Sequence, residues 1–145
     1  MNLIKLLVIS ILLSSCCEIH DVTKYTLDKI IVTRIDECDK TTFYYGDDID
    51  KNKGEIWVEY SGINDGFKGY LKFHKNGKVS LLSGDGYFQV KNIDSSYFEY
   101  KRIASYERPK IGENVCYINL ATKFEHEDNV SEGSGVTVEY IDKKW

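Results

Sequence analysis

Apolar and polar residues alternate with a period of two along most of this chain, a pattern typical of β-strands with one buried face. A helical periodicity is hard to find anywhere after the first 23 residues. Many of the 11 Tyr and 6 Phe fall inside the alternating segments, because aromatic side chains favour a pleated, half-buried surface. We therefore expect strands at Tyr25–Ile35, Thr41–Tyr45, Glu55–Tyr60, Gly69–His74, Lys78–Ser83, Tyr87–Lys91, Tyr97–Ile103, Asn114–Phe124 and Val136–Ile141.

The segment Lys75-Asn76-Gly77 separates two of these strands. It is expected to form a three-residue hairpin loop, in which a type I turn is closed by the glycine in the left-handed region. This loop sets Phe73 opposite Val79 and Leu71 opposite Leu81, so that four apolar side chains share one face. A two-residue loop would set apolar residues against polar ones, and a buried face fixes the register.

The next turn, Gly84-Asp85, suits a two-residue type II′ loop because its glycine comes first. It would place Leu81 opposite Phe88 and Val79 opposite Val90. The two turns together predict an antiparallel meander whose inner face is Leu71, Phe73, Val79, Leu81, Phe88 and Val90. The outer face would be Tyr70, Lys72, Ser80, Leu82, Tyr87 and Gln89.

An all-β antiparallel meander of eight or nine strands must hide its edges, and closure into an up-and-down barrel does so. The strand pattern and hairpin order over residues 54–103 resemble lipocalin-like β-barrels. That resemblance implies an interior for an apolar ligand, lined by Phe73, Leu81, Phe88 and Val90, although in a small barrel these side chains simply fill it. A β-sandwich would use the same strands and stays open as the alternative.

The first 15 residues follow a different pattern. Lys5 is followed by an apolar run that is too short to cross a bilayer of about 30 Å, which is typical of a secretory signal. Its exit, Leu13-Ser14-Ser15-Cys16, resembles the lipobox of bacterial lipoproteins. The resemblance implies that Cys16 receives a diacylglyceryl group, that cleavage occurs before it, and that its amino group is then acylated, for example with palmitate. Cys17 is the worse acceptor, and an ordinary cleaved signal or an uncleaved anchor is the alternative.

The expected organisation is a signal peptide at residues 1–15, a lipidated tether at residues 16–23 and a single β domain at residues 24–145. The formal net charge of −4 becomes −5 without Lys5, since Lys plus Arg falls from 19 to 18 against 23 Asp plus Glu. A mildly acidic domain without a basic stripe argues against nucleic acid as a partner. The protein is expected in the bacterial cell envelope, attached to a membrane through its acyl chains. The outer membrane is the favoured one.

Two of the four cysteines remain once Cys16 is lipidated and Cys17 lies in the tether. Cys38 and Cys116 lie in an exported domain, where disulfides persist, so we expect them to be bonded. The bridge would close a loop of about 80 residues and contribute about 4–5 kcal/mol on the chain-entropy estimate. Two separate buried thiols are the alternative.

Motifs for catalysis or cofactor binding are not found in the sequence. The stretch 47–54 has the acidic spacing of a calcium loop, but Lys53 stands where the sharp turn needs glycine, so a solvated hairpin connection is expected. Glu125-His126-Glu127-Asp128 is expected to be a charged loop, because adjacent strand residues point to opposite faces and cannot converge on a metal. No catalytic residue, metal ligand or cofactor is therefore predicted.

The sequence favours a lipid-anchored binding protein without catalysis, which binds an apolar small molecule inside or a protein outside. The alternative is an inhibitor or immunity protein against an incoming enzyme. Ser83-Gly84-Asp85-Gly86-Tyr87 is similar to the Ser-Gly-rich loop of small lipid-anchored proteins that block lysozyme. Four tyrosines are expected either to complete the core or to form an exposed recognition patch, namely Tyr60, Tyr70, Tyr87 and Tyr100.

Overall fold

A computed structural model describes residues 21–37, 40–51, 53–60, 67–84, 88–104, 107–110, 114–120, 129–130 and 135–141 of the chain. The described residues form eleven strands and a single turn of 3-10 helix, η1 (Ile49–Lys51). The strands are β1 (Asp21–Leu27), β2 (Ile30–Asp36), β3 (Lys40–Tyr45), β4 (Glu55–Tyr60), β5 (Phe67–Phe73), β6 (Val79–Ser83), β7 (Phe88–Lys91), β8 (Phe98–Arg102), β9 (Val115–Leu120), β10 (Asn129–Val130) and β11 (Thr137–Ile141).

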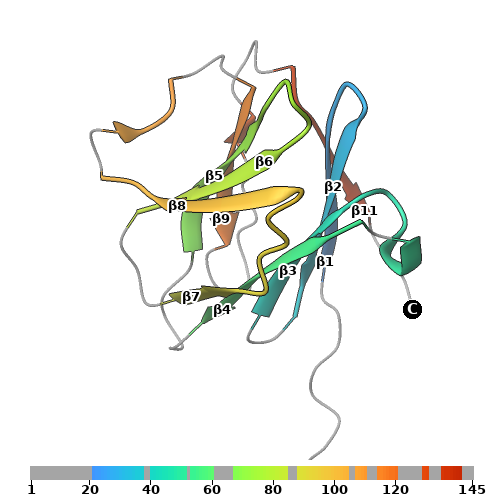
Figure 1. Ribbon diagram of the computed structural model, residues 1–145, viewed down its shortest axis with the longest axis horizontal. Helices are drawn as coiled ribbons and strands as arrows, with labels where there is room; N and C mark the ends of the chain where they lie inside the picture. Colours follow the sequence, from blue (N-terminus) through green and yellow to red (C-terminus); the bar gives the residue numbers. More distant parts are fainter. Residues whose placement is uncertain are drawn as a thin grey trace, which may run out of the picture.

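These strands form two sheets that face each other (Figure 1). Sheet A has six strands in the order β11-β1-β2-β3-β4-β7, and sheet B has five in the order β10-β9-β5-β6-β8. The predicted all-β fold is confirmed, and its described strand pairs are antiparallel except for β6 with β8. The predicted barrel is wrong, because the two sheets stay separate and do not close, and the structure agrees with the sandwich alternative.

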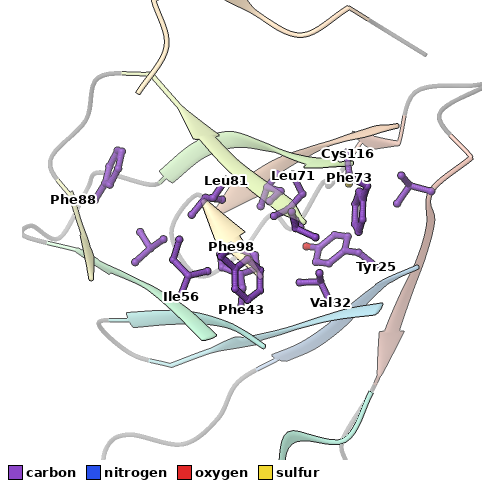
Figure 2. Close-up of a cluster of buried hydrophobic side chains, with 14 residues drawn as sticks. Tyr25, Val32, Phe43, Ile56, Leu71, Phe73, Leu81, Phe88, Phe98 and Cys116 are labelled. Carbon is purple, nitrogen blue, oxygen red and sulfur yellow. The ribbon is translucent and has the colours of Figure 1, made fainter. Parts of the chain in front are cut away.

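The core lies between the two inner faces, where side chains of both sheets meet (Figure 2). Sheet A contributes Val32, Phe43 and Ile56, each fully buried, and sheet B faces them with residues that include Phe98. The predicted inner face is confirmed: five of its six members are buried core residues, and the sixth, Val90, packs against that core partly buried. Alternation in the sequence therefore identified which side chains point inward.

The hairpin between β5 and β6 forms as predicted. Phe73 pairs with Val79 and Leu71 with Leu81. The His74 N–H donates to the Lys78 carbonyl at 2.9 Å, and the Gly77 N–H donates to the His74 carbonyl at 2.9 Å. Gly77 has a φ of +86°, the left-handed conformation that closes a type I turn in a three-residue loop.

The predicted hairpin between β6 and β7 is wrong. β7 crosses to sheet A and pairs with β4, so that Val90 lies opposite Val58 and Phe88 opposite Tyr60. The edge of β6 that β7 was expected to take is occupied by β8, which runs parallel to β6. Leu81 and Phe88 thus belong to different sheets. Their side chains still enter one core, because inward alternation is satisfied equally well from either sheet.

The single strand expected at Tyr25–Ile35 is in fact parts of two strands, β1 and β2. β1 and β2 form an antiparallel hairpin in which Leu27 pairs with Ile30, leaving Asp28-Lys29 as the turn. Asp28 has a φ of +53°, a conformation that Asp tolerates better than most residues. β1 begins at Asp21, inside the range expected for the tether.

Tyr45 joins the two sheets near the β5–β6 hairpin. Its hydroxyl donates to the Gly77 carbonyl at 2.8 Å, and its ring lies 4.7 Å from that of Tyr97, measured between ring centroids. Burial, followed by the nearby Tyr97, raises the pKa of Tyr45 above its usual value of 10. Burial and the nearby Tyr97 therefore favour the neutral phenol of Tyr45.

Candidate functional site

The outer face of sheet B carries a group of aromatic and charged side chains. Tyr70 and Tyr117 are cross-strand partners on β5 and β9, and their rings lie 5.4 Å apart between centroids in an edge-on arrangement. We call this face the tyrosine–histidine surface; its half-buried or exposed members are Tyr70, Lys72, His74, Glu99, Lys101 and Tyr117. Tyrosine is enriched at protein interfaces because its ring is apolar and its hydroxyl is polar.

The residues of β6 beneath this surface are buried although they face outward. Leu82 is 8% exposed and pairs with Tyr70 on one side and Lys101 on the other. Long side chains of this kind cover an apolar neighbour with their rings and methylene stems. The predicted outer position of Leu82 is thus confirmed, and β6 is buried on both faces because it is an inner strand of sheet B.

Three polar side chains meet at one end of the tyrosine–histidine surface. Ser80 Oγ lies 2.5 Å from His74 Nε2 and donates a hydrogen bond to Glu99 Oε1. His74 Nε2 lies 3.5 Å from the same Glu99 oxygen. Ser80 is only 1% exposed, whereas the side chains of His74 and Glu99 are 33% and 55% exposed. The cluster links the end of β5, the start of β6 and the edge strand β8.

The geometry of this cluster differs from that of a hydrolase triad. In a triad the acid binds Nδ1 of the histidine, and Nε2 faces the nucleophile. Here Glu99 and Ser80 both lie at Nε2 of His74, so the carboxylate and the hydroxyl share one nitrogen. The hydroxyl of Ser80 is also buried, while a nucleophile must reach its substrate. The contacts are those of a polar cluster that links neighbouring strands.

His74 is the last residue of the strand expected at Gly69–His74, but its cluster with Ser80 and Glu99 was not predicted. The predicted β5–β6 hairpin already brought His74 near Ser80, since the loop between them is short. Glu99 could not be placed, because it arrives on β8 through a parallel pairing with β6 that local patterning does not indicate.

A buried ion pair lies on the inner side of β2. Arg34 Nε donates to Asp36 Oδ1 at 2.9 Å, and Arg34 Nη2 lies 2.7 Å from Asp36 Oδ2. Arg34 Nη1 also donates to the Tyr25 hydroxyl at 3.1 Å, and the Thr41 hydroxyl donates to Asp36 Oδ1 at 2.7 Å. The side chain of Arg34 is 1% exposed. These contacts hold a charge inside the sandwich and connect β1, β2 and β3.

The four predicted ligand-lining residues all lie in the core. Phe73, Leu81 and Phe88 are buried there with exposed fractions of 2%, 0% and 7%, and Val90 packs against them partly buried. Figure 2 shows Phe73, Leu81 and Phe88 as members of the cluster of buried side chains between the two sheets. Their role toward a ligand stays a prediction.

Cys116, the second half of the predicted disulfide, is fully buried in the core on β9, opposite Leu71. Its sulfur lies 3.6 Å from the carbonyl oxygen of Tyr117. No disulfide is present among the described residues, and Cys38 lies outside them. The bridge therefore stays a prediction.

The acidic stretch between β3 and β4 is the hairpin connection that was predicted. Asp48 Oδ1 accepts the Asp50 N–H at 3.0 Å, and Asp48 Oδ2 lies 3.1 Å from the ammonium of Lys51. These contacts lower the pKa of Asp48, the one with Lys51 being the largest cause. The carboxylate thus caps the turn of η1.

Several residues singled out in the sequence lie outside the described ones. They are Cys16 and Cys17, the residues 125–128 around His126, the side chain of Tyr60, and Tyr87. Of the two other tyrosines, Tyr100 packs against the core and bonds Ser83 Oγ at 2.9 Å, while Tyr70 lies on the tyrosine–histidine surface. In the part of the chain that the structure describes, no helix has the length and apolarity to span a membrane.

Comparison with known proteins finds no matching family model, no matching curated protein and no matching solved structure.

Proposed function

We propose that this chain is a lipid-anchored binding protein of the bacterial cell envelope that acts without catalysis. The observation that carries the proposal is the N-terminal sequence Leu13-Ser14-Ser15-Cys16, which resembles a lipobox and is followed closely by a β domain. Acyl chains on Cys16 would hold the domain at the outer membrane, since each buried CH₂ contributes about 0.8 kcal/mol to partitioning.

A protein partner on the exterior is favoured over an apolar ligand in the interior. Phe73 and Leu81, which were expected to line a cavity, are packed side chains of the core. The exterior, by contrast, presents the tyrosine–histidine surface, where Tyr70 and Tyr117 stand among charged residues. Aromatic side chains surrounded by polar ones are the usual composition of a protein-binding surface.

The polar cluster on the same surface supports binding rather than hydrolysis. Ser80 Oγ and Glu99 Oε1 both lie at Nε2 of His74, and among the contacts of the described residues no acid binds Nδ1 to orient the ring toward a nucleophile. A polar cluster that joins three strands in this way rigidifies the surface around it. We therefore assign His74, Ser80 and Glu99 a structural role in shaping the binding face.

Labelling tests the anchor with a matched pair of variants. Cells that express the full chain are fed an alkyne-tagged fatty acid, and the purified protein is examined for the tag. We expect the wild type and Cys17→Ser to carry the tag and Cys16→Ser to lose it. A tag that persists in Cys16→Ser, or that is absent from the wild type, would contradict the proposal.

Two further measurements separate the ligand classes. Incubation with a total lipid extract, followed by re-purification and mass spectrometry, should recover no bound lipid beyond the covalent acyl chains. The alternative function, inhibition of an incoming enzyme, predicts that micromolar protein lowers the rate of lysozyme in a cell-wall turbidity assay. Absence of inhibition would remove lysozyme as the target.

A further inference from the structure

Sheet edges differ in how well they are protected against pairing with another chain. In natural sheets, short edge strands and edge lysines limit such pairing. Among the described residues, β10 is two residues long and β7 is four, and β8 exposes Lys101 and Arg102. These three edges carry protection that follows from their length or charge.

The fourth edge, β11, is different. It is five residues long, contains neither Lys nor Pro, and pairs along its whole length with β1 on one side only in the described part of the chain (Figure 1). Its sequence, Thr-Val-Glu-Tyr-Ile, consists mainly of residues that favour strands. Tyr140 is 53% exposed, the larger of the two values among exposed large apolar side chains in the described residues.

Glu139, at the centre of β11, gives this edge a charge preference. Its cross-strand partner on β1 is Lys24, a cation in the position where an opposite-charge pair would stabilise the sheet. The ammonium of Lys24, however, is paired with Asp47 in the connection between β3 and β4. Glu139 is exposed and forms no ion pair with any described residue.

We propose that β11 is a docking strand that accepts an extended segment of a partner protein with a basic residue opposite Glu139. Residues opposite each other on neighbouring strands share a face, so the flanking partner residues would lie beside Val138 and Tyr140 on the inner face. Apolar residues fit there, because Val138 packs against the core. The partner segment therefore reads apolar-basic-apolar. This inference rests on the proposed function in one respect, namely that the partner is a protein.

A second copy of this chain fits the edge poorly. In an antiparallel pair of β11 strands related by a two-fold axis, each residue i faces a residue of equal parity in the other copy. The register that pairs all five residues places Glu139 directly opposite Glu139 of the second copy. Like charges in that position are destabilising, so the charge pattern favours a basic partner over self-pairing.

Two peptides that differ at one position test the proposal. Acetylated, amidated Thr-Val-Lys-Val-Thr and Thr-Val-Glu-Val-Thr are titrated into the isotope-labelled full-length protein in detergent micelles, and backbone amide shifts are followed by NMR. We expect the Lys peptide to bind about fivefold more tightly than the Glu peptide and to shift the amides of residues 137–141. Glu139→Lys should reverse the preference, whereas the control Asp50→Lys, with the same change in net charge at an exposed site in η1, should leave it unchanged.

Equal binding of the two peptides, shifts confined to other strands, or no binding up to about 10 mM would overturn the proposal. A concentration-dependent dimer of the wild type whose β11 amides shift on association would also overturn it, in favour of self-pairing. These results concern only the edge strand. The lipid-anchored role is tested separately by the labelling of Cys16, so the two proposals can fail independently.

Discussion

The buried ion pair of β2 yields the sharpest prediction about stability. Asp36→Asn removes the carboxylate that pairs with Arg34, whose side chain is 1% exposed, so the buried guanidinium would lose this counter-ion. Breaking a buried pair in this way typically costs about 3–5 kcal/mol. Arg34→Met should cost less, about 2–3 kcal/mol, because the side chain of Asp36 is 13% exposed and keeps its bond from Thr41.

Removing both charges should recover most of the loss. In Arg34→Met/Asp36→Leu both charges of the pair are removed, and apolar replacements of buried ion pairs are often neutral. The Thr41 hydroxyl and the Tyr25 hydroxyl each lose a partner, so we expect a remaining cost of about 1–2 kcal/mol.

Urea unfolding of each variant measures these differences. Trp57 is a suitable fluorescent reporter, since it is half-buried on sheet A with the Lys40 ammonium 4.5 Å from its ring centroid. With a urea slope of about 1.5 kcal/mol/M, Asp36→Asn should lower the midpoint by about 2–3 M. A decrease below about 0.5 M, or a larger loss for Arg34→Met than for Asp36→Asn, would refute the reasoning.

Four other substitutions, one of them the control Gly84→Ala, probe the turns and the contact between the sheets. Gly77→Ala should cost about 1 kcal/mol because its φ is +86°. Gly84→Ala should change the unfolding free energy by less than about 0.5 kcal/mol, because the added Cβ would have no heavy atom of the described residues within 4 Å apart from Gly84 and its chain neighbours. Gly54→Ala should lower the midpoint of urea unfolding more than Gly77→Ala does, since its Cβ would lie 2.7 Å from Asp94 Oδ2 and 2.8 Å from the Tyr97 ring. A urea midpoint equal to that of Gly84→Ala would contradict this close approach. Tyr45→Phe should cost about 1 kcal/mol and remove a late component from the spectrophotometric tyrosine titration. Because its pKa is raised in the folded state, Tyr45 contributes stability that is present below pH 10 and is lost as pH rises through the folded pKa; an unchanged titration would contradict this.

Local pattern was sufficient to predict which residues face inward. Leu71 and Phe73 alternate with polar neighbours, and the loop that ends in Gly77 admits one register that keeps them facing Val79 and Leu81. Both the alternation and the turn chemistry act within about fifteen residues, so the sequence determines them without reference to the rest of the fold.

Strand partners were harder to predict, for a physical reason. β6 and β7 have the same alternation whether they are neighbours in one sheet or lie in facing sheets, because either arrangement buries Leu81 and Phe88. The choice depends on the parallel pairing of β6 with β8, a contact between strands separated by a third. The Asp28-Lys29 turn was missed because it lacks the glycine that usually marks such turns.

The polar contacts likewise divide into those that local pattern could predict and those that depend on pairing between distant strands. Arg34 and Asp36 have the inward parity of Val32, so opposite charges two residues apart in a buried strand could have indicated an internal ion pair. The cluster of His74, Ser80 and Glu99 had only its first two members within reach of local reasoning.

The intact mass of the protein extracted from membranes tests the central claim most directly. If the chain is a lipid-anchored binding protein, the mass should equal residues 16–145 with a diacylglyceryl group and one further acyl chain, and fragmentation should place all three chains on Cys16. A chain that starts at any other residue, or that starts at Cys16 without acyl groups, would contradict the account.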